Sequence, residues 1–169
     1  MNEPKYAKYI IREPLSRGSS APEVHICGDK HLWGEEFCPG SNFPGFPNEV
    51  TLITVTKPGV MSARHAHDYD ETLFFLGGNP LNFFDFGAEA EILLGEEDER
   101  HLINTTAIIY IPRGLMHCPI YFKKVDRPVM FMHICAATAY QRSQGDLTTG
   151  HPVKRQKYSA AEIAQMKSG

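Results

Sequence analysis

The stretch His65-Ala66-His67-Asp68-Tyr69-Asp70-Glu71 decides how this chain is expected to fold. Alternate residues of a β-strand point to the same face, so His65 and His67 project together. A turn through the two aspartates that follow can bring Glu71 back beside them. The stretch therefore places two imidazoles and one carboxylate close to one point, which is the beginning of a metal site.

A second stretch, Pro112-Arg113-Gly114-Leu115-Met116-His117, supplies a third imidazole. Proline fixes φ and glycine permits positive φ, so Pro112 and Gly114 favour a tight turn between strands that aims His117 at a fixed point. Two histidines on one strand are by themselves a weak signal, because most such pairs are surface or core residues. The added carboxylate and the downstream turn with its histidine make a metal site the better interpretation.

These two stretches resemble the two motifs of the cupin superfamily, G-x5-H-x-H-x3,4-E-x6-G and G-x5-P-x-G-x2-H-x3-N. The fixed positions of the first motif are all filled, by Gly59, His65, His67, Glu71 and Gly78. The second motif keeps Pro112, Gly114 and His117, but has Thr106 and Tyr121 where glycine and asparagine are usual. Neither departure removes a ligand, although Tyr121 is expected to change a packing or pocket contact near the ion.

The resemblance covers about residues 50–135 and implies an all-β fold, the double-stranded β-helix or jelly-roll barrel, with the ion inside it. In that fold His65, His67, Glu71 and His117 would be the metal ligands. Residues 89–126 also resemble bacterial single-cupin proteins of no assigned activity. The resemblance implies no particular reaction, because cupins include dioxygenases, isomerases, decarboxylases, lyases, storage proteins and sensory domains.

The donor set restricts the metal to one divalent transition-metal ion per chain. Imidazole nitrogen and carboxylate oxygen suit Fe, Mn, Ni, Co, Cu or Zn, and the set contains no thiolate to select zinc. Three neutral histidines and one glutamate leave a net charge of about +1 on a divalent ion, which favours an anionic ligand. Four protein ligands also leave one or two coordination positions for water, O2 or a chelating substrate.

Four further residues are expected around this site. His133 lies in the last predicted strand and is either a base or substrate contact, if it points into the barrel, or a packed core histidine. Tyr121 follows His117 on what alternation makes the same strand face, where its hydroxyl can meet a substrate or a backbone carbonyl. Leu73 and Phe75 share the parity of Glu71 and should form an apolar pocket wall.

Other polar residues near the motifs are expected to be structural. Alternation or the turn directs Arg64 and Arg113 away from the ion, with contact to a substrate carboxylate as the alternative. Turn hydrogen bonds, and not acid–base chemistry, are expected from Asp68 and Asp70. The remaining histidines have no motif support and are assigned to surface or structural roles; they are His25, His31, His101 and His151.

The pattern along the chain predicts three regions: an N-terminal extension over residues 1–49 that wraps the barrel, a cupin core over 50–135, and a C-terminal loop with a short helix over 136–169. The predicted core strands are 50–56, 61–67, 71–76, 89–94, 100–103, 107–111, 118–122 and 129–135. Tyr9-Ile10-Ile11 is a candidate first strand.

Ser159 and Glu162 have capping-box spacing, which predicts a helix ending near Met166 that either docks through Ile163 and Met166 or frays. The insertion 78–87 is a candidate lid or dimer contact.

Composition excludes several classes of protein. The chain has 169 residues, a net charge of −3, 42% hydrophobic and 22% charged residues, which is typical of one globular domain. No basic stripe and no long apolar run is present, so nucleic acid and membranes are not expected partners. The N-terminus lacks the pattern of a secretory signal, and a cytoplasmic location is expected. The four cysteines are then expected to be free, buried thiols; they are Cys27, Cys38, Cys118 and Cys135.

The strand from Glu71 is apolar on both faces, since Phe74 and Leu76 point outward. A second subunit is the expected cover, giving a homodimer, with the N-terminal segment as the alternative.

The leading functional hypothesis is a metal-dependent enzyme acting on a small anionic or chelating molecule, first as a dioxygenase and second as an isomerase or lyase. A non-catalytic binding or sensing cupin with an anchoring metal, and a purely structural barrel, are the alternatives.

Overall fold

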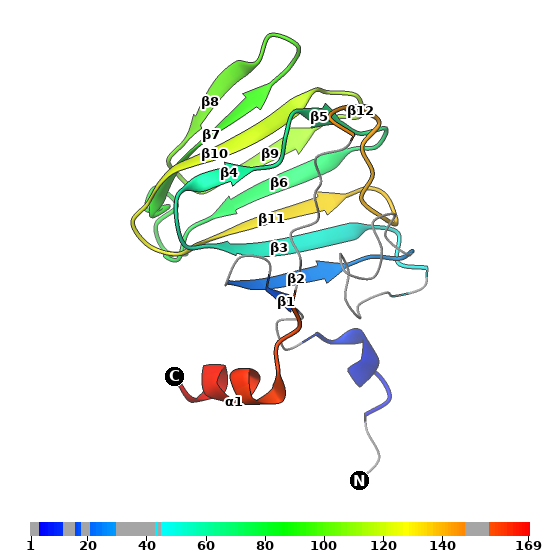
Figure 1. The fold of residues 1–169 in the computed structure, drawn as a ribbon, viewed down its shortest axis with the longest axis vertical. Coiled ribbons are helices and arrows are strands. Elements are labelled where there is room, and N and C mark those ends of the chain that lie inside the picture. The colour runs from blue at the N-terminus through cyan, green and yellow to red at the C-terminus, as the bar shows by residue number, and fades with distance from the viewer. Residues whose placement is uncertain (1–3, 12–15, 18–20, 30–42, 44, 148–155) are drawn as a thin grey trace.

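Twelve short strands in two antiparallel sheets make up almost all of the regular structure in the described part of the chain (Figure 1). The computed structural model describes residues 4–11, 16–17, 21–29, 43, 45–147 and 156–169. The first sheet has the order β1-β2-β3-β11-β6-β9, and the second has the order β12-β5-β10-β7-β8, with β4 also paired to β10. The jelly-roll prediction is confirmed by this arrangement.

The first sheet consists of β1 (Ser16–Arg17), β2 (Pro22–Ile26), β3 (Glu49–Val55), β11 (Val129–Cys135), β6 (Glu71–Leu76) and β9 (Ala107–Ile111). The second consists of β12 (Gln144–Gly145), β5 (His65–Ala66), β10 (His117–Val125), β7 (Ala88–Leu94), β8 (Glu99–Ile103) and β4 (Gly59–Met61). A single turn of 3-10 helix, η1, spans Ala7–Tyr9, and α1 spans Ala160–Ser168.

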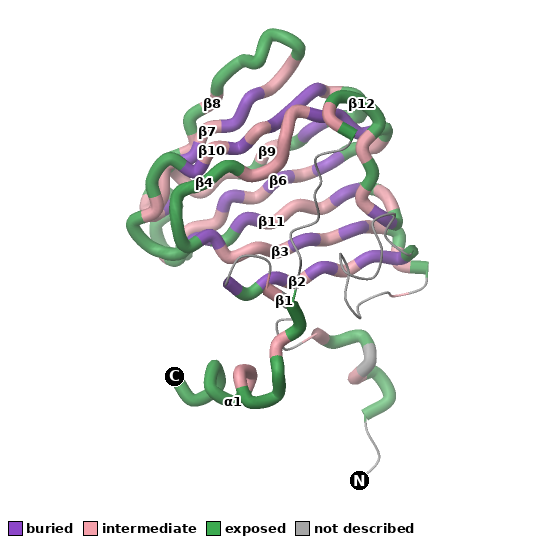
Figure 2. The backbone as a smooth tube through the Cα atoms, in the orientation of Figure 1, coloured by how far each residue is buried: buried purple, intermediate pink, exposed green. Residues whose placement is uncertain are grey.

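Burial alternates along the strands, as expected when one face of each strand points between the sheets (Figure 2). In β6, Glu71, Leu73 and Phe75 are buried, whereas the residues between them are half-buried. The core between the sheets is formed by twelve buried residues: Val55, Leu73, Phe75, Phe86, Ala90, Ile92, Ile111, Cys118, Ile120, Phe122, Val129 and Phe131. This core positions one end of the barrel, where the polar motif residues lie.

Seven of the eight predicted core strands are confirmed within one or two residues at most ends. The predicted strand 61–67 is instead two short strands, β4 and β5, because Ser62 has a φ of 62° and interrupts the extended backbone between them. The candidate first strand at Tyr9-Ile10-Ile11 is wrong, since Tyr9 ends η1. The prediction also missed β1, β2 and β12, of which β2 pairs with β3 and continues the first sheet.

The C-terminal helix begins as predicted. The Ser159 hydroxyl accepts a hydrogen bond from the backbone N–H of Glu162, and the Glu162 carboxylate accepts one from the backbone N–H of Ser159. Arg17 forms an ion pair with Glu162 at 2.5 Å, which ties α1 to β1. Met166 is exposed, Ile163 is half-buried and no residue of α1 is buried, so α1 does not bury an apolar face, as the docked alternative would require. No helix within the described residues has the length and apolar character needed to cross a bilayer.

Candidate metal centre

The two motifs meet at one end of the barrel. His65 lies on β5 directly opposite His117 at the start of β10, and Glu71 begins β6 in the other sheet. The polar side chains of these motifs are buried, with exposed fractions of only 1% to 3% for His65, His67, Glu71 and His117. Such burial is costly for polar groups unless they have partners, so the contacts of each one matter.

The Pro112–Gly114 turn, which the sequence predicts, is hydrogen-bonded to the first motif. Gly114 has a φ of 80°, and its backbone N–H donates to the carbonyl oxygen of His67 at 2.8 Å. The backbone N–H of Arg113 donates to Oδ1 of Asp70 at 2.8 Å, which confirms a hydrogen-bonding role for that aspartate at the turn. These bonds fix the backbone on which His117 is presented relative to His67.

Each of the three imidazoles has its Nδ1 atom next to a backbone carbonyl oxygen. His65 Nδ1 lies 2.5 Å from the Ala63 oxygen, His117 Nδ1 lies 2.9 Å from the Leu115 oxygen, and His67 Nδ1 contacts the Gln141 oxygen. A carbonyl can only accept, so in all three rings Nδ1 carries the proton and donates. The lone pair is therefore on Nε2, as in metal-binding histidines held by an outer partner.

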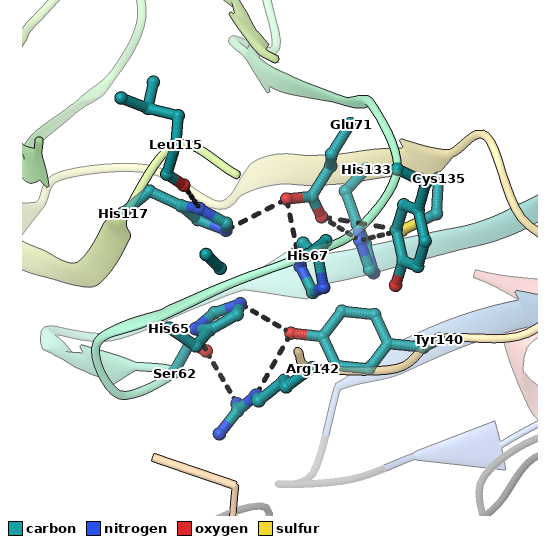
Figure 3. Close-up of polar contacts among 12 residues, drawn as sticks. Ser62, His65, His67, Glu71, Leu115, His117, His133, Cys135, Tyr140 and Arg142 are labelled. Atoms are coloured by element: carbon teal, nitrogen blue, oxygen red, sulfur yellow. Dashed lines mark hydrogen bonds and ion pairs between the residues drawn. The ribbon is translucent and has the colours of Figure 1, made fainter. Parts of the chain in front are cut away.

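The Nε2 atoms of His67 and His117 converge on one oxygen of Glu71, Oε2, at 3.5 and 3.1 Å (Figure 3). All three atoms are buried and none has a hydrogen-bond partner of acceptable geometry. Ligand atoms of these three residues lie within 4.8 Å of one another. Three buried atoms that can each offer a lone pair and that face one another form an environment that a cation stabilises.

His65 lies beside this trio, but its Nε2 atom, unlike those of His67 and His117, has a hydrogen-bond partner. Its ring centroid lies 4.3 Å from that of His117 and 4.7 Å from that of His67. Its Nε2 atom accepts a hydrogen bond from the Tyr140 hydroxyl at 2.8 Å. The four predicted ligands are thus brought together, with His65 engaged by a residue that the motifs do not contain.

Electrostatics favour the forms that bind metals. Burial, reinforced by the neighbouring imidazole of His117, lowers the pKa of His65 to about 3, so this ring is neutral at pH 7. Burial alone would raise the pKa of Glu71, but the imidazoles of His117, His133 and His67 more than offset this and hold the pKa well below its usual range. Glu71 is therefore an ionised carboxylate. The donor set fits a divalent transition-metal ion.

The fold is identified by two observations. Two antiparallel sheets face each other, and both motifs lie at one end of the space between them. It is the cupin fold. Neither a family model nor a curated protein matches the sequence. Among solved structures, the chain is similar to a cupin superfamily protein from Desulfitobacterium hafniense, with 11% identity, a TM-score of 0.41, and coverage of 80% of this chain and 91% of that chain.

Two other solved structures show a comparable degree of similarity. A cupin-2 domain protein from Rhodospirillum rubrum has 15% identity, a TM-score of 0.39, and coverage of 76% of this chain and 68% of that chain. The Cnp3 cupin domain of Schizosaccharomyces pombe has 6% identity, a TM-score of 0.45, and coverage of 72% and 67%. At such identities the activity of this protein has to be argued from its own residues.

His133 points into the barrel, toward Glu71 and Glu49, and its role as a base or substrate contact stays a prediction. Its Nδ1 atom lies 2.7 Å from Oε1 of Glu71, the oxygen that faces away from His67 and His117. Its Nε2 atom lies 3.7 Å from Oε2 of Glu49. His133 thus holds the Glu71 carboxylate from behind and is a positioning residue for it.

Tyr121 lies on the wrong face for a role at the ion. Its neighbours Ile120 and Phe122 are 1% and 3% exposed and belong to the core, whereas Tyr121 is half-buried and paired with the exposed Val60 of β4. The pairing of β10 with β7 is irregular between His117 and Ile120, so alternation does not carry through from His117. Of the two alternatives for the Tyr121 hydroxyl, a substrate contact at the ion does not fit this position.

Leu73 and Phe75 point inward, with exposed fractions of 2% and 0%. The Phe75 ring packs against Phe86, Phe122 and Phe131 and is part of the closed core. Leu73 lies between Glu71 and Phe75 on the same face of β6, so it is the nearer of the two to the polar centre. Their role as a pocket wall stays a prediction.

The remaining sequence assignments concern residues away from the centre. Arg64 is structural, since it pairs with Glu96 and Asp98 at 2.8 Å each in the β7–β8 hairpin. His25 is buried at 3% exposure and bonded to Thr51, whereas His101 is partly exposed beside Glu99. Cys118 and Cys135 are free and buried as predicted, and Cys27 is buried as well. Three predicted residues lie outside the described part of the chain: His31, Cys38 and His151.

The residues that sequence reasoning missed come from the segment after β11. Tyr140 contacts His65, the carbonyl of Gln141 contacts His67, and Arg142 donates to Ser62 Oγ at 2.9 Å. This segment returns to the centre because β12 pairs with β5. Nothing in the polar, loop-like composition of residues 141–145 indicates that pairing.

Proposed function

We propose that this cupin is a metal-dependent oxidoreductase of the dioxygenase type, acting on a small anionic or metal-chelating molecule. The ion would be held by His65, His67, Glu71 and His117. The observation that carries the proposal is the convergence of buried Nε2 and carboxylate atoms whose other sides are already engaged. When bound, a redox-active ion with open positions would hold substrate and O2 next to each other.

Charge supports an anionic substrate. Neutral imidazoles and one carboxylate leave about one unit of positive charge on a divalent ion and its ligands. Arg142 adds a permanent positive charge on the side of His65, since its Nε lies 3.4 Å from the Tyr140 hydroxyl and its Nη2 lies 2.9 Å from Ser62. A carboxylate or enolate group entering from this side meets a cation, a guanidinium and a hydroxyl donor.

The chain positions its polar groups without help from a substrate. His133 holds one oxygen of Glu71, which leaves the other oxygen for the ion. Burial raises the pKa of the Tyr140 hydroxyl well above its usual range, so the hydroxyl stays protonated and acts as a hydrogen-bond donor. Tyr140 would therefore orient a bound anion rather than deprotonate it.

The test is reconstitution. Protein purified without added metal is analysed for its ions, stripped, and reloaded separately with Fe, Mn, Ni, Co, Cu or Zn. Each form is presented with small carboxylates and chelating metabolites in an oxygen electrode, and products are identified by mass spectrometry. We expect substrate-dependent O2 uptake with a redox-active ion, no uptake with zinc, and no uptake by His67→Ala. The matched control, His101→Ala, should behave as the wild type because His101 lies outside the centre.

Other outcomes would replace the proposal. Conversion of a substrate without O2 uptake, or in the zinc form, would make the protein an isomerase or lyase that polarises its substrate. Tight binding without conversion across all six ions would make it a binding or sensing module. Ligand binding and conversion that are unchanged by metal removal would reduce the ion to a structural role.

A further inference from the structure

A second cluster of potential ligands lies on the inward face of the first sheet. Glu49 on β3 and Cys135 on β11 are cross-strand partners, and Glu71 on β6 is the partner of Cys135 on its other side. Ligand atoms of Glu49, His133 and Cys135 lie within 4.8 Å of one another. Glu49 is 2% exposed and Cys135 is 0% exposed. This cluster shares no residue with the trio formed by His67, Glu71 and His117, but it contacts Glu71, whose Oε1 atom lies 3.7 Å from Cys135 Sγ and 2.7 Å from His133 Nδ1.

Glu49 is fixed in place by a chain of buried side chains. The Thr51 hydroxyl donates to Glu49 Oε1 at 2.6 Å, and His25 Nδ1 lies 2.8 Å from the same hydroxyl oxygen. Because the hydroxyl hydrogen is directed to Glu49, His25 Nδ1 must be the donor in the second bond. The other ring nitrogen of His25 lies 3.2 Å from Glu23. Thr51 and His25 thus orient one oxygen of Glu49 and leave the other for a different partner.

That other oxygen, Glu49 Oε2, is buried and has no hydrogen-bond partner. The Nε2 atom of His133 is 3.7 Å away, which is too far for a hydrogen bond but within ion-pair distance. Two ligands bound about 2.1 Å from a tetrahedral ion are about 3.4 Å apart, so this separation fits two atoms that share a cation. Within the described residues, the buried side-chain atoms without hydrogen-bond partners therefore lie at two places. One is the trio of His67, Glu71 and His117, called the primary centre below, and the other is this cluster.

His133 connects the two places through its two ring nitrogens. Nδ1 donates to Glu71 Oε1 at 2.7 Å, and this bond directs the lone pair to Nε2, on the side of Glu49. A carboxylate behind a histidine is the arrangement that orients metal-binding imidazoles. Glu71 can therefore be a ligand at the primary centre and the supporting carboxylate at the cluster.

We propose that Glu49, His133 and Cys135 bind a second divalent cation, one that prefers a thiolate ligand, such as Zn(II) or Co(II). The thiolate distinguishes this site from the primary centre, whose donors are only imidazole and carboxylate. One carboxylate, one thiolate and one neutral imidazole balance the charge of a divalent ion, which suits a site this deeply buried. The thiol proton would be released on binding. The inference does not depend on the proposed reaction.

The test is anaerobic titration of the metal-free protein with Co(II), followed by absorption spectroscopy and elemental analysis. Wild type should bind two equivalents and show a thiolate-to-cobalt charge-transfer band. Cys135→Ser should bind one equivalent and lose the band, and Glu49→Gln should also bind one equivalent. His67→Ala should lose the primary equivalent and retain the band, which separates this test from that of the proposed function. The matched control is Cys27→Ser, at another buried cysteine outside the cluster, which should behave as wild type.

Two results would overturn the second site. The first is a single equivalent in wild type without a charge-transfer band. The second is a band that persists in Cys135→Ser, which would assign the thiolate to another residue such as Cys118, whose Sγ atom lies near His65 and His117. Near-ultraviolet circular dichroism of each metal-free variant reports whether it is folded. If Cys135→Ser does not fold, the stoichiometry of Glu49→Gln decides the question.

Discussion

The hydroxyl oxygen of Tyr140 lies 2.8 Å from Nε2 of His65, the nitrogen whose lone pair a metal ion would use. One lone pair cannot serve a proton donor and a cation together, so metal binding must break this hydrogen bond. Tyr140→Phe should therefore tighten metal binding by about threefold to tenfold, which corresponds to a net hydrogen bond of about 0.5–1.5 kcal/mol. Competition with a chromophoric chelator measures the change. Weaker binding by the variant would instead show that the Tyr140 oxygen is itself a ligand.

His67→Ala should lower metal content strongly and leave a folded barrel. His67 contributes Nε2 to the converging trio, but it does not belong to the hydrophobic core that holds the sheets together. Elemental analysis and circular dichroism measure the two effects, with His101→Ala as the matched histidine control. Full metal occupancy in His67→Ala would refute its assignment as a ligand.

Phe75→Ala should be among the most destabilising single changes in this chain. The side chain is completely buried and contacts three other aromatic rings, so its removal leaves a cavity that costs about 3–5 kcal/mol of unfolding free energy. Phe84→Ala, at 82% exposure, is the control and should cost less than about 0.5 kcal/mol. Chemical denaturation measures both variants. Similar losses in the two would show that Phe75 is not a core residue.

The N-terminal turn of α1 should loosen in acid. Hydrogen bonds from the backbone and hydroxyl of Ser159, together with Arg17, lower the pKa of Glu162 from 4.5 to about 2. Because the folded pKa lies below the unfolded one, the stabilisation is complete above pH 4.5 and is lost as the pH falls through about 2. Amide exchange in α1 over this range reports the loss. Glu162→Gln is the control and should show no such dependence; an identical pH response in it would assign the effect elsewhere.

The outer face of the first sheet is the predicted homodimer surface. It exposes Ile108, Tyr110 and Met130 at 64%, 60% and 43%. Light scattering should give twice the chain mass of 19.0 kDa for wild type and the single-chain mass for Ile108→Lys. Leu102→Lys, on β8 of the other sheet, is the control and should remain dimeric. A wild type that stays monomeric at high concentration contradicts the prediction.

Local sequence patterns predicted the parts of this protein that depend on local geometry. Alternation and a turn with positive φ at Gly114 sufficed to bring His67, Glu71 and His117 to one place. Alternation failed at Tyr121, because the irregular pairing that shifts its face depends on how β10 meets β7. The failure shows that side-chain parity holds only as far as the strand pairing stays regular.

The residues that complete the two clusters depend on cross-strand register, which the sequence does not reveal. Glu49 and Cys135 are far apart in the chain and become neighbours only because β3 pairs with β11. Tyr140 reaches His65 only because the segment after β11 turns back to pair with β5. A pattern search along one strand cannot detect either relationship.

The pairing of β12 with β5 also has a consequence for how the protein matures. Every strand of the hydrophobic core precedes Tyr140 and Gln141 in the chain, so a ribosome releases the barrel before it releases the residues that complete the centre. Until then the His67 ring lacks its carbonyl partner and His65 lacks its phenol. An ion that binds during synthesis would thus meet a centre that still lacks the contacts of Tyr140 and Gln141.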